Sequence, residues 1–127
     1  MEFVAIVVVL ALLQYFSFAL LVGKARAQYQ VHAPAITGHP VFERYYRVHQ
    51  NTLEMIVMFI PAIVLFSYWV RPDIAAGIGV VYLIGRFIYL RAYVADPASR
   101  GLGFGLSMLP ILVLLLGGGG AAVFSLL

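Results

Sequence analysis

Four long apolar runs constrain the fold of this chain more than any other feature. They cover residues 3–22, 53–70, 74–95 and 102–127. About 20 apolar residues let a helix cross a bilayer, and in lipid only helices and closed barrels satisfy their own backbone hydrogen bonds. Only 10% of the residues are charged and 64% are hydrophobic, against about a quarter charged in soluble proteins. We therefore expect an all-α membrane protein, a four-transmembrane-helix bundle in which residues 1–127 form a single domain.

The basic residues predict how the chain is oriented in the membrane. The connection between the second and third runs has only Arg71, whereas the first and third connections have most of the cations. These are Lys24, Arg26, Arg44, Arg47, Arg91 and Arg100. By the positive-inside rule, the first and third connections are expected to be cytoplasmic, with both termini across the inner membrane. The first run is expected to be a retained span rather than a secretion signal, because no Lys or Arg precedes it.

Charge and cysteine content exclude two classes of function. The net charge of +3 does not indicate a nucleic-acid partner, because the basic residues are spread between apolar runs rather than gathered in one tract. The chain has no cysteine, so it has no disulfide, no thiolate metal ligand and no thiol nucleophile of its own. Any thiol chemistry has to use the thiol of another molecule.

Two of the predicted helices carry a polar stripe. The stripe of the second helix is Arg47, Asn51 and Glu54, and that of the third is Tyr82, Arg86, Tyr89 and Tyr93. Their spacing of i, i+4, i+7 places side chains on one helix face. Because the second helix starts at the membrane surface where the third helix ends, residues from both stripes should share one level. We expect Arg47, Asn51 and Glu54 to lie beside Tyr89, Tyr93 and Arg100.

Charged groups within the spans have to be satisfied inside the protein. A charge at mid-helix costs about 2.5–3.5 kcal/mol on insertion scales. Glu54 and Arg86 are therefore expected to face the bundle interior and to pair with each other or with Arg47. For Arg86 this predicts either a structural role, in which it joins helices, or a supporting role behind the residues that contact a ligand. The remaining polar residues lie at one depth, and they are more numerous than a purely structural bundle requires. They therefore indicate a binding site.

Three other features favour structural interpretations. The histidines His32, His39 and His49 do not stand at a metal-ligand spacing with any carboxylate pair, so no metal site is expected. The glycine-rich residues 101–105 lack the preceding strand and the following Lys-Ser/Thr of a phosphate loop. We expect them to form a flexible lead into the fourth helix. The four glycines at residues 117–120 are expected to let helices pack closely.

Two segments and one arginine of this chain resemble a known family. They are FERYYRVHQNTLE at residues 42–54, VYLIGRFIYLRAY at residues 81–93, and Arg100. These segments are similar to the membrane-associated proteins in eicosanoid and glutathione metabolism, which include microsomal glutathione transferases and leukotriene C4 synthase. The resemblance implies a homotrimer of four-helix subunits. It also implies that glutathione, as co-substrate, binds between adjacent subunits near the cytoplasmic face.

The resemblance implies a role for each polar residue. Arg100 is expected to stabilise the thiolate of glutathione, and Arg26 to reach the ligand from a neighbouring subunit. The remaining glutathione contacts are expected from Arg47, Asn51, Glu54, Tyr89 and Tyr93. Three positions depart from the leukotriene synthase pattern: His49 replaces a glutamine, Met55 a tyrosine and Ala27 an arginine. These departures argue against leukotriene C4 synthesis and leave glutathione binding intact.

The activity implied is that of a glutathione transferase or a glutathione-dependent peroxidase. Its second substrate is expected to be a hydrophobic electrophile or a lipid hydroperoxide that arrives from the membrane lipids. A non-catalytic scaffold that binds and presents lipids is the alternative within the same fold. A small multidrug transporter fits less well, because the first helix offers no carboxylate beyond Glu2 for proton coupling.

Overall fold

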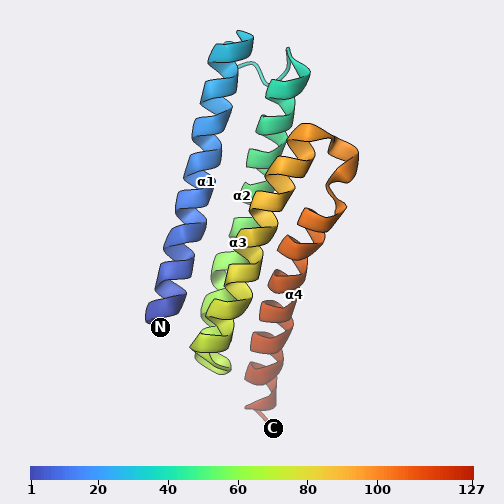
Figure 1. Cartoon of the computed structure of the whole chain (residues 1–127). Helices are drawn as coiled ribbons and strands as arrows, with labels where there is room; N and C mark the ends of the chain where they lie inside the picture. The colour runs from blue at the N-terminus through green and yellow to red at the C-terminus, as the bar shows by residue number, and fades with distance from the viewer.

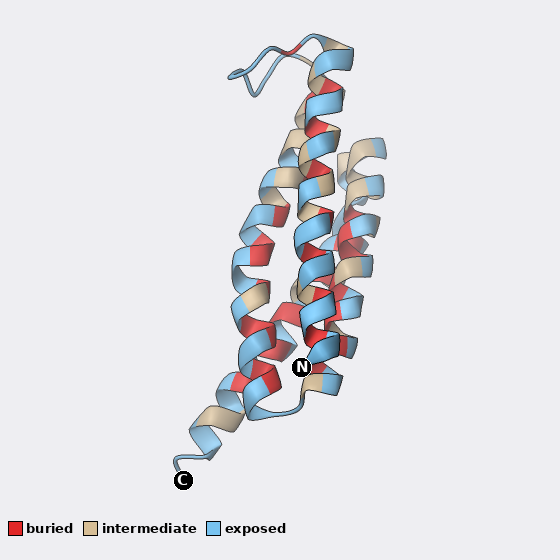
Figure 2. Ribbon diagram, turned by 90° about the vertical axis from the view of Figure 1, so that its left-hand side faces the viewer, coloured by how far each residue is buried: buried red, intermediate tan, exposed pale blue.

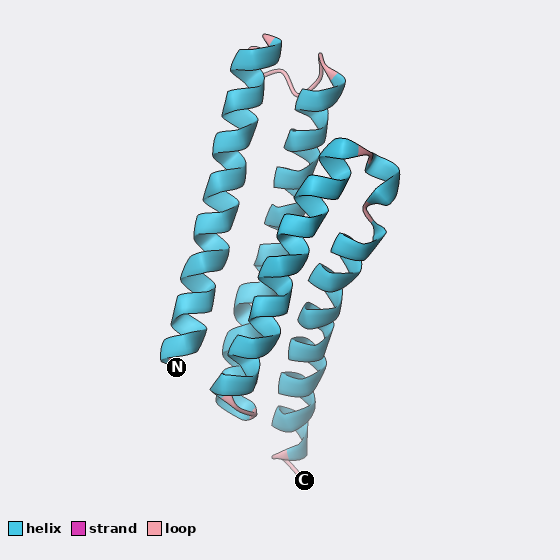
Figure 3. Cartoon of the chain, viewed as in Figure 1, coloured by secondary structure: helices cyan, strands magenta, loops and turns pink.

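The computed structural model describes all 127 residues, which form four long helices and one short helical turn. The elements are α1 (Glu2–Tyr29), α2 (Pro40–Trp69), α3 (Pro72–Ala95), the turn η1 (Pro97–Ser99) and α4 (Gly101–Phe124). The helices run in alternating directions, so both termini lie at the same end of the bundle (Figure 1). The non-helical residues are confined to the connections and the chain ends (Figure 3).

The outside of the bundle is apolar. All four helices are long and apolar enough to cross a membrane. Large side chains such as Phe3, Leu20 and Leu116 are at least 60% exposed. Buried residues lie on the faces that the helices turn toward one another (Figure 2). An apolar exterior around a packed interior is what a lipid environment requires, and the chain is an integral membrane protein.

The first two helices are longer than the apolar runs that predict them. The connection between these two runs is shorter than the runs predict, because α1 and α2 extend beyond residues 22 and 53 and leave only residues 30–39 between them. Gln30 adopts the left-handed conformation, with φ of 56°, that ends α1. His39 caps α2, its Nδ1 accepting a hydrogen bond from the Val41 N–H at 3.1 Å. Apolar runs mark the bilayer, whereas a helix continues until its backbone is capped.

Tyr82 departs from the polar stripe predicted for α3. Its ring is 0% exposed and stacks on Phe59 with centroids 3.9 Å apart. Its hydroxyl has no hydrogen-bond partner within the chain. With Ile63, Ile111 and Leu114 it belongs to the apolar core to which all four helices contribute. The stripe is therefore polar only from Arg86 toward the carboxyl end of α3.

Glycines let α3 and α4 approach each other closely. A Cβ on Gly85 would lie 2.6 Å from the carbonyl carbon of Leu106, and one on Gly103 would lie 2.5 Å from Tyr89 Cα. Real Cβ atoms do not come this close, so glycine is what permits the observed separation of the two backbones. The prediction that residues 101–105 form a flexible lead is wrong, because they already belong to α4 and pack against α3.

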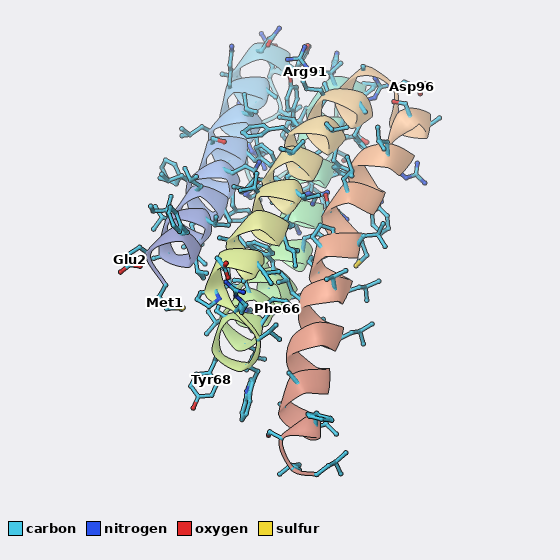
Figure 4. The ribbon with its side chains drawn as sticks, turned by 60° about the horizontal axis from the view of Figure 1, so that its bottom comes forward. Met1, Glu2, Phe66, Tyr68, Arg91 and Asp96 are labelled. Atoms are coloured by element: carbon cyan, nitrogen blue, oxygen red, sulfur yellow. The ribbon has the colours of Figure 1, made fainter.

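The glycine run at residues 117–120 packs α4 on α2 through its first two members. The Phe66 ring would lie 2.6 Å from a Cβ on Gly117, and the Phe66 backbone nitrogen 3.0 Å from one on Gly118. Phe66 is labelled in Figure 4. The other two glycines have nothing within 4 Å. The prediction of close packing therefore applies to half of the run.

The guanidinium of Arg86 lies fully buried and joins three helices. Its Nε donates to Ser107 Oγ of α4 at 3.0 Å. Its Nη1 donates to Asn51 Oδ1 at 2.7 Å and to Thr52 Oγ1 at 3.3 Å, both in α2. The side chain is 0% exposed. A charge buried in a membrane bundle needs acceptors for its donors. Three neutral oxygens supply them to Nε and Nη1, whereas the buried Nη2 has no hydrogen-bond partner within the chain.

The predicted ion pair between Arg86 and Glu54 is wrong. Glu54 is exposed on the single chain and forms no ion pair with Arg86 or with Arg47. At the depth of Arg86, α2 presents Asn51 and Thr52 instead. Neutral acceptors bind two of the three guanidinium nitrogens without the further cost of desolvating a carboxylate.

Replacing Gly85 with alanine should force α3 and α4 apart and lower the free energy of unfolding by about 1–3 kcal/mol. Gly77→Ala is the matched control in the same helix, because a Cβ there meets nothing within 4 Å. Its higher helix propensity makes that change neutral or stabilising by up to about 1 kcal/mol. Unfolding of the solubilised protein in a denaturing detergent, followed by tryptophan fluorescence, measures both. Equal stabilities of the two variants would contradict the close approach.

Candidate functional site

A polar cavity of about 390 Å³ opens between α2, the end of α3 and the residue that precedes α4. It lies at the end of the bundle that Arg91 and Asp96 mark in Figure 4, opposite Met1 and Tyr68. The lining residues are Arg47, Gln50, Asn51, Glu54, Tyr89, Tyr93 and Arg100. Six of these seven residues are the ones that the polar stripes and the third connection predict to lie together.

One face of α2 supplies four of the lining side chains. Arg47, Gln50, Asn51 and Glu54 are separated by three and four residues, the spacing at which side chains share a helix face. Gln50 is the residue that the sequence analysis missed. Its i+3 spacing from Arg47 is the signal that could have identified it.

The carboxyl end of α3 supplies an aromatic wall. The rings of Tyr89 and Tyr93 stack with centroids 5.5 Å apart. The Arg86 guanidinium lies over the Tyr89 ring, 4.4 Å from its centroid. Tyr89 is only 5% exposed, so packing holds its ring in place. Tyr93 is partly exposed and continues the wall toward the rim of the cavity.

Arg100 reaches the cavity from the turn that follows α3. Asp96 caps this turn, its Oδ1 accepting a hydrogen bond from the Ala98 N–H at 3.1 Å. The Nη1 of Arg100 donates to the Pro97 carbonyl at 2.9 Å. Its Nε and Nη2 have no partner within the chain, and they are free to bind a ligand.

The charges at the cavity are not paired with one another. The structure contains two ion pairs, and both lie at the opposite end of the bundle. Arg47, Arg100 and Glu54 therefore line the cavity without an ionic partner. Two guanidinium groups and one carboxylate suit a ligand that has more anionic than cationic groups, because each of its charges can then meet an opposite charge.

Arg26 does not line the cavity of its own subunit. Its Nη1 donates to the Ala35 carbonyl at 2.6 Å and to the Val31 carbonyl at 3.4 Å. Its guanidinium carbon lies 4.8 Å from the centroid of the Phe42 ring. Arg26 thus holds the connection of residues 30–39 against α1. Its contribution to a neighbouring subunit stays a prediction.

A second hollow of about 450 Å³ adjoins the cavity, because Arg47 and Tyr93 line both. The first connection and the start of α2 form its other walls, which include Glu43 and Arg44. Arg44 Nη1 also donates to the Val94 carbonyl of α3 at 3.0 Å. This bond ties the start of α2 to the end of α3 and helps to set the width of the hollow.

Two of the three histidines make structural contacts. The His49 ring stacks on Tyr15 with centroids 4.6 Å apart, and the His39 ring stacks on Tyr29 at 4.0 Å. No group of three or more His, Cys, Asp or Glu side chains in the structure could hold a metal ion. The side chains that line the cavity are arginine, carboxylate, amide and phenol groups.

Comparison with known proteins shows what this chain is similar to. A Synechocystis protein of uncharacterised function is 41% identical over 113 residues, which are 89% of this chain and 82% of that protein. Microsomal glutathione S-transferase 2 of Homo sapiens is 39% identical over 104 residues, 82% of this chain and 71% of that enzyme. Leukotriene C4 synthase of Bos taurus is 33% identical over 96 residues, 76% of this chain and 64% of that enzyme.

The family match extends along nearly the whole chain. The model of the MAPEG family, the membrane-associated proteins in eicosanoid and glutathione metabolism, matches residues 4–120. This range includes most of every helix and all seven residues that line the cavity. The chain therefore belongs to the MAPEG family.

Proposed function

We propose that this chain is a membrane-embedded, glutathione-dependent transferase that binds glutathione in the polar cavity. The observation that carries the proposal is the set of unpaired charges on Arg47, Arg100 and Glu54. Two of the relatives support it, because they are named as a glutathione S-transferase and a leukotriene C4 synthase. The volume of about 390 Å³ also lies in the range of roughly 300–1,000 Å³ that small-molecule sites occupy.

The charges of the cavity complement those of glutathione. The ligand carries two carboxylates, one ammonium group and a thiol. In the proposed complex, Arg47 and the neighbouring subunit's Arg26 bind the carboxylates, and Glu54 binds the ammonium group. The amide of Asn51 bonds to a polar group of the peptide, and the phenols of Tyr89 and Tyr93 form one wall.

Arg100 is proposed to stabilise the reactive thiolate. A thiol with a pKa near 8.5 is only a few per cent ionised at neutral pH. Lowering that pKa by about two units requires roughly 2.7 kcal/mol of preferential stabilisation of the thiolate. One hydrogen bond to a charged group contributes about 1.5–3 kcal/mol. A hydrogen bond from the free Nε or Nη2 of Arg100 could therefore supply most or all of the stabilisation that the thiolate requires.

A homotrimer is proposed to complete the site. Arg47, Gln50, Glu54 and Arg100 are exposed on a single chain, although they lie on membrane helices or at their ends. A neighbouring subunit that covers them keeps these polar groups away from lipid. The distribution of basic residues favours a site at the cytoplasmic face of the inner membrane, with both termini on the other side.

The second substrate is proposed to be a hydrophobic electrophile or a lipid hydroperoxide that arrives through the bilayer. In conjugation, the thiolate sulfur bonds to the electrophilic carbon, and the bond to the leaving group breaks. In peroxide reduction, the thiolate sulfur bonds to the terminal peroxide oxygen, the O–O bond breaks, and the lipid leaves as an alcohol after it takes up a proton. The thiol of a second glutathione then reacts with the resulting sulfenic acid, which forms the disulfide and releases water. Both reactions begin with the same thiolate, so one site serves either of them.

Replacing Arg100 with alanine should remove most turnover and spare glutathione binding. Loss of one charge-assisted hydrogen bond corresponds to a fall in kcat of roughly ten- to 150-fold. Conjugation of glutathione to a chromogenic aromatic electrophile measures turnover, and stopped-flow ultraviolet absorbance measures thiolate formation. Arg91→Ala is the matched control, because Arg91 does not line the cavity. Unchanged turnover would exclude Arg100 as the thiolate ligand, and a wild-type protein that binds glutathione without ionising it would support the lipid-presenting scaffold.

Replacing Glu54 with glutamine should weaken glutathione binding by about tenfold, because the ligand's ammonium group loses its charged acceptor. Affinity for an analogue that lacks the amino group should change less than about twofold, since that contact does not exist there. Isothermal titration calorimetry on the solubilised protein gives both constants. Glu43→Gln, in the adjoining hollow, is the control. Equal losses for the two ligands would show that Glu54 does not bind the amine.

Mixed trimers test whether Arg26 acts in the neighbouring subunit. Arg26→Ala and Arg100→Ala are each expected to be nearly inactive alone. Random co-assembly should restore activity to about a quarter of the wild-type level, because that share of sites combines an intact Arg100 with a neighbour's intact Arg26. Turnover of the co-expressed protein measures the restoration. If mixing restored nothing while each variant still formed trimers, Arg26 would act within its own subunit or not at all.

A further inference from the structure

We propose that Arg86 is a positioning residue for the cavity, which it does not line. Arg86 holds the Asn51 side chain so that the two N–H donors of the Asn51 amide face the cavity. It also keeps the neighbouring Tyr89 ring in place. Arg86 thereby raises the affinity for glutathione while making no contact with the ligand. This inference rests on the proposed function, because it names the ligand that these groups receive.

The chemistry of arginine determines the orientation of the Asn51 amide. A guanidinium has donors only, so the atom 2.7 Å from Arg86 Nη1 has to be an acceptor. That atom is Asn51 Oδ1, and the amide nitrogen therefore points away from Arg86. An isolated asparagine can exchange the two ends of its amide by rotation about its last torsion. The bond to Arg86 removes that freedom.

The free end of the amide is available to a ligand. Asn51 is partly exposed and lines the cavity. Its Oδ1 accepts from Arg86, whereas its Nδ2 makes no hydrogen bond within the chain. Two N–H donors beside the guanidinium groups of Arg47 and Arg100 suit a carboxylate or a peptide carbonyl. With the opposite amide orientation, an oxygen would face these anionic or carbonyl groups and repel them.

The same guanidinium also supports the aromatic wall. Arg86 lies over the Tyr89 ring at 4.4 Å, and the Tyr89 ring stacks on Tyr93 at 5.5 Å. Cation–π contacts of this kind contribute more in desolvated surroundings, and Arg86 is fully buried. One buried side chain therefore sets the orientation of groups from both polar stripes.

A substitution at Ser107 distinguishes a positioning role of Arg86 from a role that only joins helices. It accepts a hydrogen bond from Arg86 Nε at 3.0 Å, but it belongs to α4 and does not line the cavity. Ser107→Ala therefore weakens the anchoring of the same guanidinium while leaving Asn51 and Tyr89 in contact with it. If Arg86 only joined helices, loss of the Ser107 bond and loss of the Asn51 bond would have the same kind of effect.

Glutathione affinity and kinetics of three variants form the first part of the test. Arg86→Met should raise the KM and Kd for glutathione by about three- to tenfold, the worth of one lost hydrogen bond, with kcat within about twofold because Arg100 is unchanged. Arg86→Lys, which keeps a charge and a donor, should recover part of the affinity. Ser107→Ala should leave Kd within about twofold even where it lowers the unfolding midpoint.

Asn51 offers a readout that does not depend on activity, because it is the only asparagine in the chain. Protein labelled with [¹⁵N]asparagine shows one pair of side-chain amide proton signals. The chemical shifts of this pair should be the same in the wild type and in Ser107→Ala. In Arg86→Met the pair should shift or broaden, because the amide exchanges between orientations. Addition of glutathione should move the wild-type pair in a saturable way.

The amide signals and the Kd for glutathione together decide whether Arg86 is a positioning residue. Altered amide signals and weakened glutathione binding in Arg86→Met, with neither in Ser107→Ala, would support the positioning role. Unchanged amide signals and unchanged Kd in a folded Arg86→Met would overturn it and leave Arg86 as a helix-joining residue. If the wild type bound no glutathione while Arg86→Met still altered the amide signals, the proposed ligand would fail and the positioning of Asn51 would stand.

Discussion

The buried guanidinium of Arg86 is the constraint on which the rest of the bundle depends. A charge in the interior of a membrane protein has to be given acceptors, and those of Arg86 come from α2 and α4. Ser107 reaches it because Gly85 and Gly103 let the α3 and α4 backbones approach each other closely. The glycine packing therefore permits the polar contact between Arg86 and Ser107.

The two ends of the bundle differ in how their charges are satisfied. At the end with the termini, Arg71 and Asp73 form an exposed ion pair with two hydrogen bonds, so neither group needs a ligand. At the other end, the two arginines and the glutamate of the cavity have no ionic partner. The unpaired charges at this end are suited to bind a charged ligand. On that basis we propose that glutathione binds there.

The number of helices and most of the lining residues could be predicted from the sequence for one physical reason. A helix that crosses a bilayer has a set length and a set period, so the apolar runs locate the spans and the polar spacing locates one face. Alternating direction then brings the start of α2 beside the end of α3, where Arg47, Asn51, Tyr89 and Tyr93 lie. The missed residue, Gln50, follows the same periodicity and was accessible to the same reasoning.

The features that could not be predicted depend on how each helix is rotated about its axis and shifted along it relative to its neighbours. Glu54 and Arg86 are both charged residues of the polar stripes, yet the packing of α3 against α2 gives Arg86 the side chains of Asn51 and Thr52. Periodicity within one helix does not specify which residues of two helices stand opposite each other. The ends of α1 and α2 were missed because caps such as His39 act on the backbone outside the apolar runs. A subunit interface, and with it the place of Arg26, is not encoded in the pattern of a single span.

A structure of the protein reconstituted in lipid with saturating glutathione tests the central claim most directly. One glutathione should occupy each polar cavity, with its ammonium group at Glu54 and its carboxylates at Arg47 and at Arg26 of the next subunit. The sulfur is expected within hydrogen-bond distance of Arg100. An empty cavity, or glutathione bound elsewhere on the protein, would contradict the account.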